Sequence, residues 1–210
     1  MLNPKVAVFL SWYKRPDYTQ KCVEAINNAQ EYTNVDFYLV EDDNPNTGLR
    51  NRILDFFESI KDKNYDIICK IDNDCIYPKN WLNDVLAVFA KSDADILSPN
   101  VMPSNAAFTY GKPDKENKGY MPSEIVGGLW CMKYSLIKDM QFERHELNGL
   151  MGAVPLLRQI VTEKEPKIGW IPNVIVEDMG HWSGMSEHHI KSKEHFDYSK
   201  EVGRAVAWSV

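Results

Sequence analysis

Two aspartates separated by one residue are the part of this sequence best suited to chemistry. Asp72 and Asp74 follow directly after the apolar run 67–71, which predicts a short buried strand. In an open α/β sheet, ligands bind outside the carboxyl ends of the strands. Carboxylate oxygens are the ligands that Mg²⁺ and Mn²⁺ prefer. The pair therefore predicts a site for a divalent cation that would hold a diphosphate, and a solvated surface turn is the alternative interpretation.

The elements that would position this pair alternate between strand and helix over the first 75 residues. Apolar runs predict strands at 5–11, 35–40 and 67–71, and apolar residues at helical spacing predict helices at 17–31 and 50–61. This alternation predicts a parallel sheet with right-handed crossover connections. The carboxyl ends of such strands meet at one edge of the sheet.

The rest of the chain continues the pattern with weaker signals. A helix is predicted at 80–90 and a strand at 95–101, and the long polar stretch 103–122 follows. Beyond it the sequence predicts a strand with a glycine pair at 125–132, a helical turn at 135–140, a helix at 150–161, one or two strands at 168–176 interrupted by Pro172, and a helix at 198–208. The expected fold class is a single α/β domain with a mostly parallel central sheet and helices on both faces.

Composition and charge narrow the functional classes. The chain has 210 residues, a formal net charge of -6 and a sequence pI near 5.4. An acidic chain is not expected to coat a nucleic-acid duplex, which requires a basic face. The four cysteines form no Cys-x-x-Cys pair, and we interpret them as reduced, buried small side chains. No signal peptide or apolar run of membrane-spanning length is visible, so a cytoplasmic location without a transmembrane segment is expected.

Five short motifs occur in an order that is typical of one enzyme family. They are Ser-Trp-Tyr-Lys-Arg-Pro at 11–16, Val-Glu-Asp-Asp at 40–43, Gly-Leu-Arg-Asn-Arg at 48–52, Ile-Asp-Asn-Asp at 71–74 and Val-Gly-Gly at 126–128. In this order and spacing the chain resembles a glycosyltransferase of the GT-A fold, which is Rossmann-like and uses nucleotide-diphosphate sugars. It is most similar to the inverting, family-two-like branch, and the resemblance covers roughly residues 5–132.

The resemblance implies an activity, a cofactor and partners. We expect a metal-dependent transfer of a sugar from a nucleotide-diphosphate sugar, with a UDP-sugar as the expected donor and Mn²⁺ or Mg²⁺ as the cofactor. The expected acceptor is a hydroxyl group on a glycan. Residues 1–102 would form the nucleotide- and metal-binding half, and residues 103–210 the acceptor-binding half with the C-terminal tail.

The resemblance also assigns roles to individual residues. Asp74 is expected to ligate the metal, Asp72 to hold the ribose or a metal-bound water, and His181 to complete the metal site. The expected nucleotide- or donor-binding residues are Ser11, Tyr13, Arg15, Asp42, Asp43, Arg52, Asp72, Asn73, Gly127 and Gly128. Glu41 or Asp43 is an alternative to Asp42 in a shifted register. Arg52 is equally consistent with a charge on a helix surface, and the glycine pair with a β-bulge.

The catalytic base is the point where the chain departs from the family pattern. The inverting branch carries an acidic pair at the start of the helix after the glycine strand, and residues 147–152 contain none. The nearest carboxylates are Glu143, Glu146 and Asp178, of which we expect Glu146 first and Asp178 second to act as the base. An inverting mechanism is expected, but this departure leaves a retaining mechanism open.

Two other functions are consistent with parts of the sequence. A nucleotidyltransferase acting on sugar phosphates also combines such a sheet with metal-binding carboxylates. It would require a glycine-rich loop after the first strand, whereas residues 12–16 contain no glycine. A non-catalytic carbohydrate-binding domain of the same fold is the second alternative, and the missing acidic pair favours it.

Overall fold

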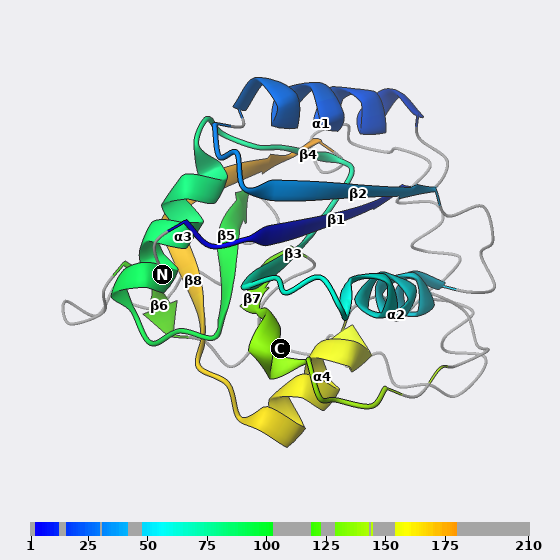
Figure 1. Cartoon of the computed structure of the whole chain (residues 1–210). Coiled ribbons are helices and arrows are strands. Elements are labelled where there is room, and N and C mark those ends of the chain that lie inside the picture. The colour runs from blue at the N-terminus through cyan, green and yellow to red at the C-terminus, as the bar shows by residue number, and fades with distance from the viewer. Residues whose placement is uncertain are drawn as a thin grey trace, which may run out of the picture.

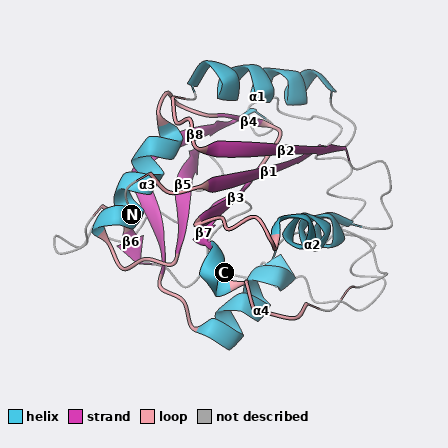
Figure 2. Ribbon diagram, viewed as in Figure 1, coloured by secondary structure: helices cyan, strands magenta, loops and turns pink. Residues whose placement is uncertain are grey.

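A mixed β-sheet forms the centre of the molecule (Figures 1 and 2). The computed structural model describes residues 3–12, 16–29, 31–41, 48–102, 119–122, 129–142, 144 and 154–179. Within these ranges the sheet has eight strands: β1 (Val6–Trp12), β2 (Val35–Glu41), β3 (Ile67–Ile71), β4 (Cys75–Ile76), β5 (Ile96–Met102), β6 (Met121–Pro122), β7 (Trp130–Lys133) and β8 (Ile168–Asp178). The helices are α1 (Pro16–Ala29), α2 (Gly48–Ile60), α3 (Trp81–Lys91), α4 (Val154–Lys164) and the short 3₁₀ helix η1 (Tyr134–Leu136).

The strand order gives the sheet a mostly parallel character. The order is β2-β1-β3-β7-β5-β8-β4, and β6 pairs with β8. The five long strands β1, β2, β3, β5 and β8 run in one direction, and the short strands β4, β6 and β7 run against them. The expected α/β class, with helices on both faces of a mostly parallel sheet, is therefore confirmed.

Side chains that alternate along the central strands divide the core into two layers. Val6, Val8 and Leu10 of β1 pack in the same cluster as the buried faces of α1 and α3. Ala7 and Phe9 pack in the other cluster, with α2 and α4. This two-residue period is that of a strand buried on both faces, and it explains why β1 reads as a continuous apolar run.

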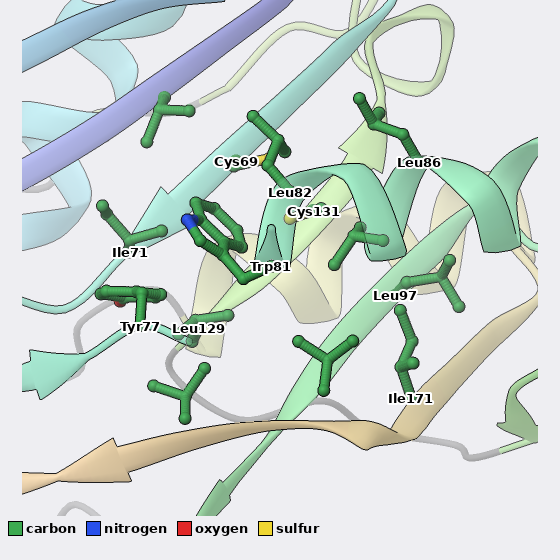
Figure 3. Packing of buried hydrophobic residues seen from close by; sticks show 14 of the residues in the cluster. Cys69, Ile71, Tyr77, Trp81, Leu82, Leu86, Leu97, Leu129, Cys131 and Ile171 are labelled. Atoms are coloured by element: carbon green, nitrogen blue, oxygen red, sulfur yellow. The ribbon is translucent and has the colours of Figure 1, made fainter. Parts of the chain in front are cut away.

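The start of α3 packs against the carboxyl end of β3, in the same hydrophobic cluster as Val6, Val8 and Leu10. Trp81 and Leu82 are almost completely buried and belong to the same hydrophobic cluster as Ile71 and Leu129 (Figure 3). The Tyr77 ring lies 5.0 Å from the Trp81 ring, measured between centroids. Burial of an aromatic side chain of this size contributes about 2–3 kcal/mol. The segment between β3 and α3 is therefore held firmly on the sheet.

Most predicted elements within the described ranges coincide with observed ones, and the helix predicted at 198–208 lies outside those ranges. The segment 168–176 was expected to be interrupted at Pro172, but β8 is one strand of 11 residues. Its pairing with β5 shifts register between Pro99 and Asn100, because Pro99 faces Ile171 and Asn100 faces Ile175. The bulge accommodates a proline that cannot donate to the ladder. The sequence did not predict β4 or β6, which have two residues each, and β6 lies inside the polar stretch 103–122.

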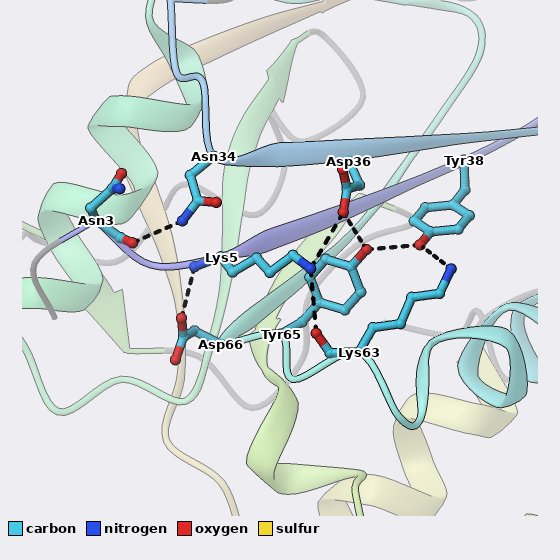
Figure 4. Close-up of polar contacts among 8 residues, drawn as sticks. All are labelled: Asn3, Lys5, Asn34, Asp36, Tyr38, Lys63, Tyr65 and Asp66. Carbon is cyan, nitrogen blue, oxygen red and sulfur yellow. Dashed lines mark hydrogen bonds and ion pairs between the residues drawn. The ribbon is translucent and has the colours of Figure 1, made fainter.

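A polar network ties together the amino ends of β1, β2 and β3 (Figure 4). The Tyr65 hydroxyl donates to Asp36 Oδ2 at 2.5 Å and lies 2.8 Å from the Tyr38 hydroxyl. Lys63 Nζ donates to that Tyr38 hydroxyl at 3.0 Å, and Lys5 Nζ lies 3.7 Å from Asp36 Oδ2. Burial, together with these partners, raises the pKa of Tyr65, so its hydroxyl keeps its proton.

The four cysteines are buried and none forms a disulfide, which confirms the expectation that they act as small buried side chains. Cys69 of β3 and Cys131 of β7 face each other across the sheet. Among the described helices, none has both the length and the apolar character needed to cross a membrane.

Candidate functional site

The carboxyl ends of three neighbouring parallel strands lie at one edge of the sheet. In the strand order β2-β1-β3, Trp12 pairs with Glu41 and Leu10 pairs with Ile71. Asp72 follows Ile71 directly, so it lies at the same edge as the end of β1. This topology places Asp72 at the carboxyl ends of the strands, as expected, whereas the polar residues that follow β1 and β2 lie outside the described ranges.

The Asp72-Asn73-Asp74 segment, here called the DND turn, is anchored first through the backbone of Asp72. The Asp72 N–H donates to the Tyr77 hydroxyl oxygen at 3.1 Å, and that hydroxyl lies 3.2 Å from the Asp72 carbonyl oxygen, to which it donates. The Cys22 thiol donates to the same carbonyl at 3.4 Å. Burial raises the pKa of Tyr77 well above its usual value and that of Cys22 to about 12, so both keep the protons that they donate.

The other two residues of the DND turn are tied to two further elements. Asn73 Nδ2 donates to Thr19 Oγ1 of α1 at 2.8 Å. The Asp74 carbonyl oxygen accepts a hydrogen bond of 2.8 Å from the Met179 N–H, just beyond β8. The turn is therefore fixed from α1 on one side and from the residue after β8 on the other, which holds its backbone in place.

The end of β8 brings a third carboxylate to this place. Cys75 of β4 pairs with Asp178, and Asp74 precedes Cys75 in the chain. Burial, followed by the negative charges of Asp72, Asp74 and Asp178, raises the pKa of the Cys75 thiol well above its usual value. Asp178, the second choice for the catalytic base, thus lies beside the predicted metal-binding turn.

A buried lysine pairs with the first aspartate. The Lys70 ammonium forms an ion pair with Asp72 Oδ1, and the Lys70 side chain is only 3% exposed. The sequence analysis missed Lys70 because this residue was counted as part of the apolar run 67–71. The position of Lys70 in a buried strand was itself a signal, because lysine is rarely buried without a partner. Residues two apart on a strand point to the same face, so Asp72 was the partner to expect.

The carboxylates suit a hard divalent cation. No three His, Cys, Asp or Glu side chains within the described ranges form a complete metal cluster. Mg²⁺ is commonly held by one or two carboxylates, with phosphate oxygens and water as the other ligands. Asp72 and Asp74 provide such oxygens at the edge where ligands bind. The donor set therefore fits an ion that is shared with a diphosphate.

The structure locates only some of the predicted site residues. Ser11 lies in β1 next to the site edge, and Arg52 lies half-buried in α2. Predicted site residues outside the described part of the chain are Tyr13, Arg15, Asp42, Asp43, Gly127, Gly128, Glu146 and His181. Their roles remain predictions.

Sequence comparison identifies no relative: no protein-family model matches the chain, and no curated protein matches it. Several solved structures do match the chain. A mannosyltransferase from Pyrobaculum calidifontis, solved with GDP-Man and Mn²⁺, has a TM-score of 0.55 and 14% identity over 85% of this chain. GalNAc-T7, solved with UDP, GalNAc and Mn²⁺, has a TM-score of 0.54 and 10% identity over 84% of this chain. The protein A197 from STIV has a TM-score of 0.51 and 14% identity over 82% of this chain.

The fold is that of the GT-A glycosyltransferases. At these identities the likeness concerns the fold alone. The chain spans 58% of the mannosyltransferase and 44% of GalNAc-T7, but 84% of A197. The fold predicted from the motifs is thus confirmed, whereas the likeness to the family-two branch stays a prediction.

Proposed function

We propose that this protein is a metal-dependent glycosyltransferase that moves a sugar from a nucleotide-diphosphate sugar to an acceptor hydroxyl. The observation that carries the proposal is the anchored DND turn, with Asp72 and Asp74 at the carboxyl ends of the strands and Asp178 beside them. The mannosyltransferase and GalNAc-T7, which share the fold, were solved with nucleotide ligands and Mn²⁺ and support the same chemistry here.

The residues of the site have distinct parts in this reaction. Asp74 and Asp72 would hold the divalent cation, and when bound it neutralises the charge that develops on the departing diphosphate. The acceptor hydroxyl oxygen forms a bond to the anomeric carbon, while the bond from that carbon to the diphosphate oxygen breaks and its electron pair leaves with the diphosphate. The hydrogen bonds that anchor the backbone of the turn would supply orientation, because a pre-positioned site needs less reorganisation during the reaction.

The hydroxyl proton needs a base for an inverting displacement. We propose Asp178 and Glu146 as the two candidates. Asp178 is supported by its position at the end of β8, paired with Cys75 next to the DND turn. We further propose a UDP-sugar as donor and a glycan as acceptor, with His181 and the strand-end residues Ser11, Tyr13, Arg15, Asp42 and Asp43 contributing to the nucleotide and metal site.

Calorimetric titration tests the proposal. UDP, GDP and dTDP are titrated with and without Mn²⁺ into the wild-type chain, Asp74→Ala and the control Asp139→Ala, which removes an exposed carboxylate outside the site. We expect at least one nucleotide to bind in a Mn²⁺-dependent way, and Asp74→Ala to weaken it by about 100-fold or more. Asp139→Ala should bind like the wild type.

The outcome against the proposal is the absence of Mn²⁺-dependent binding for all three nucleotides. A product assay then separates the related enzymes, since a glycosyltransferase releases a nucleoside diphosphate and a nucleotidyltransferase releases pyrophosphate. Slow hydrolysis of a UDP-sugar by the isolated protein would count against a purely carbohydrate-binding domain.

A further inference from the structure

Lys70 is the only charged side chain that is buried among the described residues. It lies on the central strand β3, where its register partners are Phe9 of β1 and Trp130 of β7, both completely buried. Removing an ammonium from water is costly unless a partner compensates for it. A lysine in this position therefore requires a specific counter-charge.

That counter-charge is the first carboxylate of the DND turn. The Asp72 side chain is 33% exposed, so the ion pair reaches from the core of the sheet to the rim of the site. The backbone of Asp72 is independently fixed by Tyr77 and Cys22. Because the backbone of Asp72 and the Lys70 ammonium are both held in place, the orientation of the Asp72 carboxylate is held as well.

The ammonium also changes what Asp72 can bind. Its positive charge at Oδ1 opposes a second cation, so Asp72 is a weaker ligand for a free metal ion than an isolated carboxylate would be. The same charge favours an approaching anion such as a diphosphate. The second oxygen, Oδ2, can still accept a hydrogen bond from a hydroxyl group.

We propose that Lys70 is a positioning residue for Asp72, which aims this carboxylate, weakens the binding of free metal and strengthens the binding of the nucleotide diphosphate. This inference rests on the proposed function. It predicts changes of opposite sign for two ligands, a pattern that loss of packing alone does not produce.

The test compares Lys70→Met with the wild type by calorimetry, using Mn²⁺ alone and UDP or GDP alone. Met has a similar length and no charge, and the exposed part of Asp72 can be solvated. We expect Mn²⁺ to bind about tenfold more tightly and the metal-free nucleotide to bind about tenfold more weakly. Lys70→Arg keeps the positive charge, so its affinities for both ligands should lie closer to the wild-type values than those of Lys70→Met.

A second comparison covers the case in which Lys70→Met does not fold. The double variant Lys70→Met with Asp72→Asn removes both charges, and the reference is Asp72→Asn alone. The double variant should bind Mn²⁺ about tenfold more tightly than its reference. Thermal unfolding of every variant shows whether the affinities refer to folded protein.

The outcomes separate the inference from the proposed function. If the wild type binds Mn²⁺ and nucleotide but the folded Lys70 variants bind both equally well, Lys70 is merely structural and the inference is wrong, whereas the function stands. The same holds if both affinities fall together. If the wild type binds none of UDP, GDP and dTDP in the presence of Mn²⁺, the proposed function and the inference are both wrong. If it binds a nucleotide only together with Mn²⁺ and neither ligand alone, the inference is wrong and the function stands.

Discussion

At the scale of single residues, the site depends on groups that keep their protons. The Asp72 carbonyl accepts hydrogen bonds from the Cys22 thiol and the Tyr77 hydroxyl. An ionised thiolate or phenolate could not donate. Burial raises the pKa of both groups, so the geometry of the DND turn is insensitive to pH near neutrality.

The Cys22 thiol should make the fold sensitive to alkali. Burial raises its pKa to about 12 in the folded chain, against 9.0 for an ordinary cysteine thiol, so the thiol of the unfolded chain ionises first. The stability that Cys22 contributes is fully present below pH 9 and is lost as the pH rises towards 12. At pH 10 the loss is about 1 kcal/mol. Urea unfolding in EDTA at pH 7 and pH 10 measures it.

Cys22→Ser is the matched control, because a hydroxyl donates to the same carbonyl but does not ionise in this range. The variant should start from a different stability at pH 7 and lose about 1 kcal/mol less than the wild type between pH 7 and pH 10. Equal losses in the two proteins would contradict the role assigned to the thiol.

Sequence reasoning found the carboxylates but not the groups that hold them. Asp72 and Asp74 were predictable because they follow a recognisable buried strand. Cys22 and Tyr77 were not, since their partners are backbone atoms of Asp72, 50 and 5 residues away, and a side chain carries no pattern that reveals such a bond. Lys70 could have been found from its place in the buried strand.

At the scale of elements, β8 connects the second half of the chain to the site. It pairs with β5 along its length, with β6 near its start and with β4 at its end. β4 was missed in the sequence because two residues carry no periodicity, and only the nearby end of β8 makes them a strand. The same contact places Asp178 beside Asp74.

Gly169 should be indispensable for the pairing of β6 with β8. A Cβ atom there would collide with the Tyr120 ring and lie 2.5 Å from the Met121 carbonyl oxygen, a backbone atom that cannot move away cheaply. Gly169→Ala is therefore expected to lower the free energy of unfolding by about 1–3 kcal/mol. The measurement is urea denaturation followed by far-UV circular dichroism.

Asn173→Ala serves as the control, because Asn173 lies on the same strand but is exposed. It should change stability by no more than about 0.5 kcal/mol. If Gly169→Ala were as mild as this control, β6 would not be packed as closely on β8 as the structure indicates.

At the scale of the whole molecule, the two ends of the parallel strands have different tasks. The carboxyl ends carry the DND turn and Asp178, whereas the amino ends carry the network around Tyr65. Strand direction was predictable from the alternation of strands and helices. The insertion of β7 between β3 and β5 was not, because antiparallel pairing of a four-residue strand leaves no mark in the sequence.

This separation predicts that stability and ligand binding can be changed independently. Tyr65→Phe removes the hydroxyl that donates to Asp36 and contacts Tyr38, so two polar groups lose a partner. The free energy of unfolding should fall by about 1–2 kcal/mol. The affinities for Mn²⁺ and UDP should stay at their wild-type values, because the network lies at the opposite ends of the strands from Asp72 and Asp74.

Asp74→Ala is the reciprocal variant and should show the reverse, with ligand binding lost and the fold retained. Chemical denaturation and calorimetric titration on the same two proteins make the comparison complete. A loss of nucleotide affinity in folded Tyr65→Phe would mean that the two ends of the sheet are coupled. The site would then depend on the whole sheet as a unit, and not on the locally anchored turn.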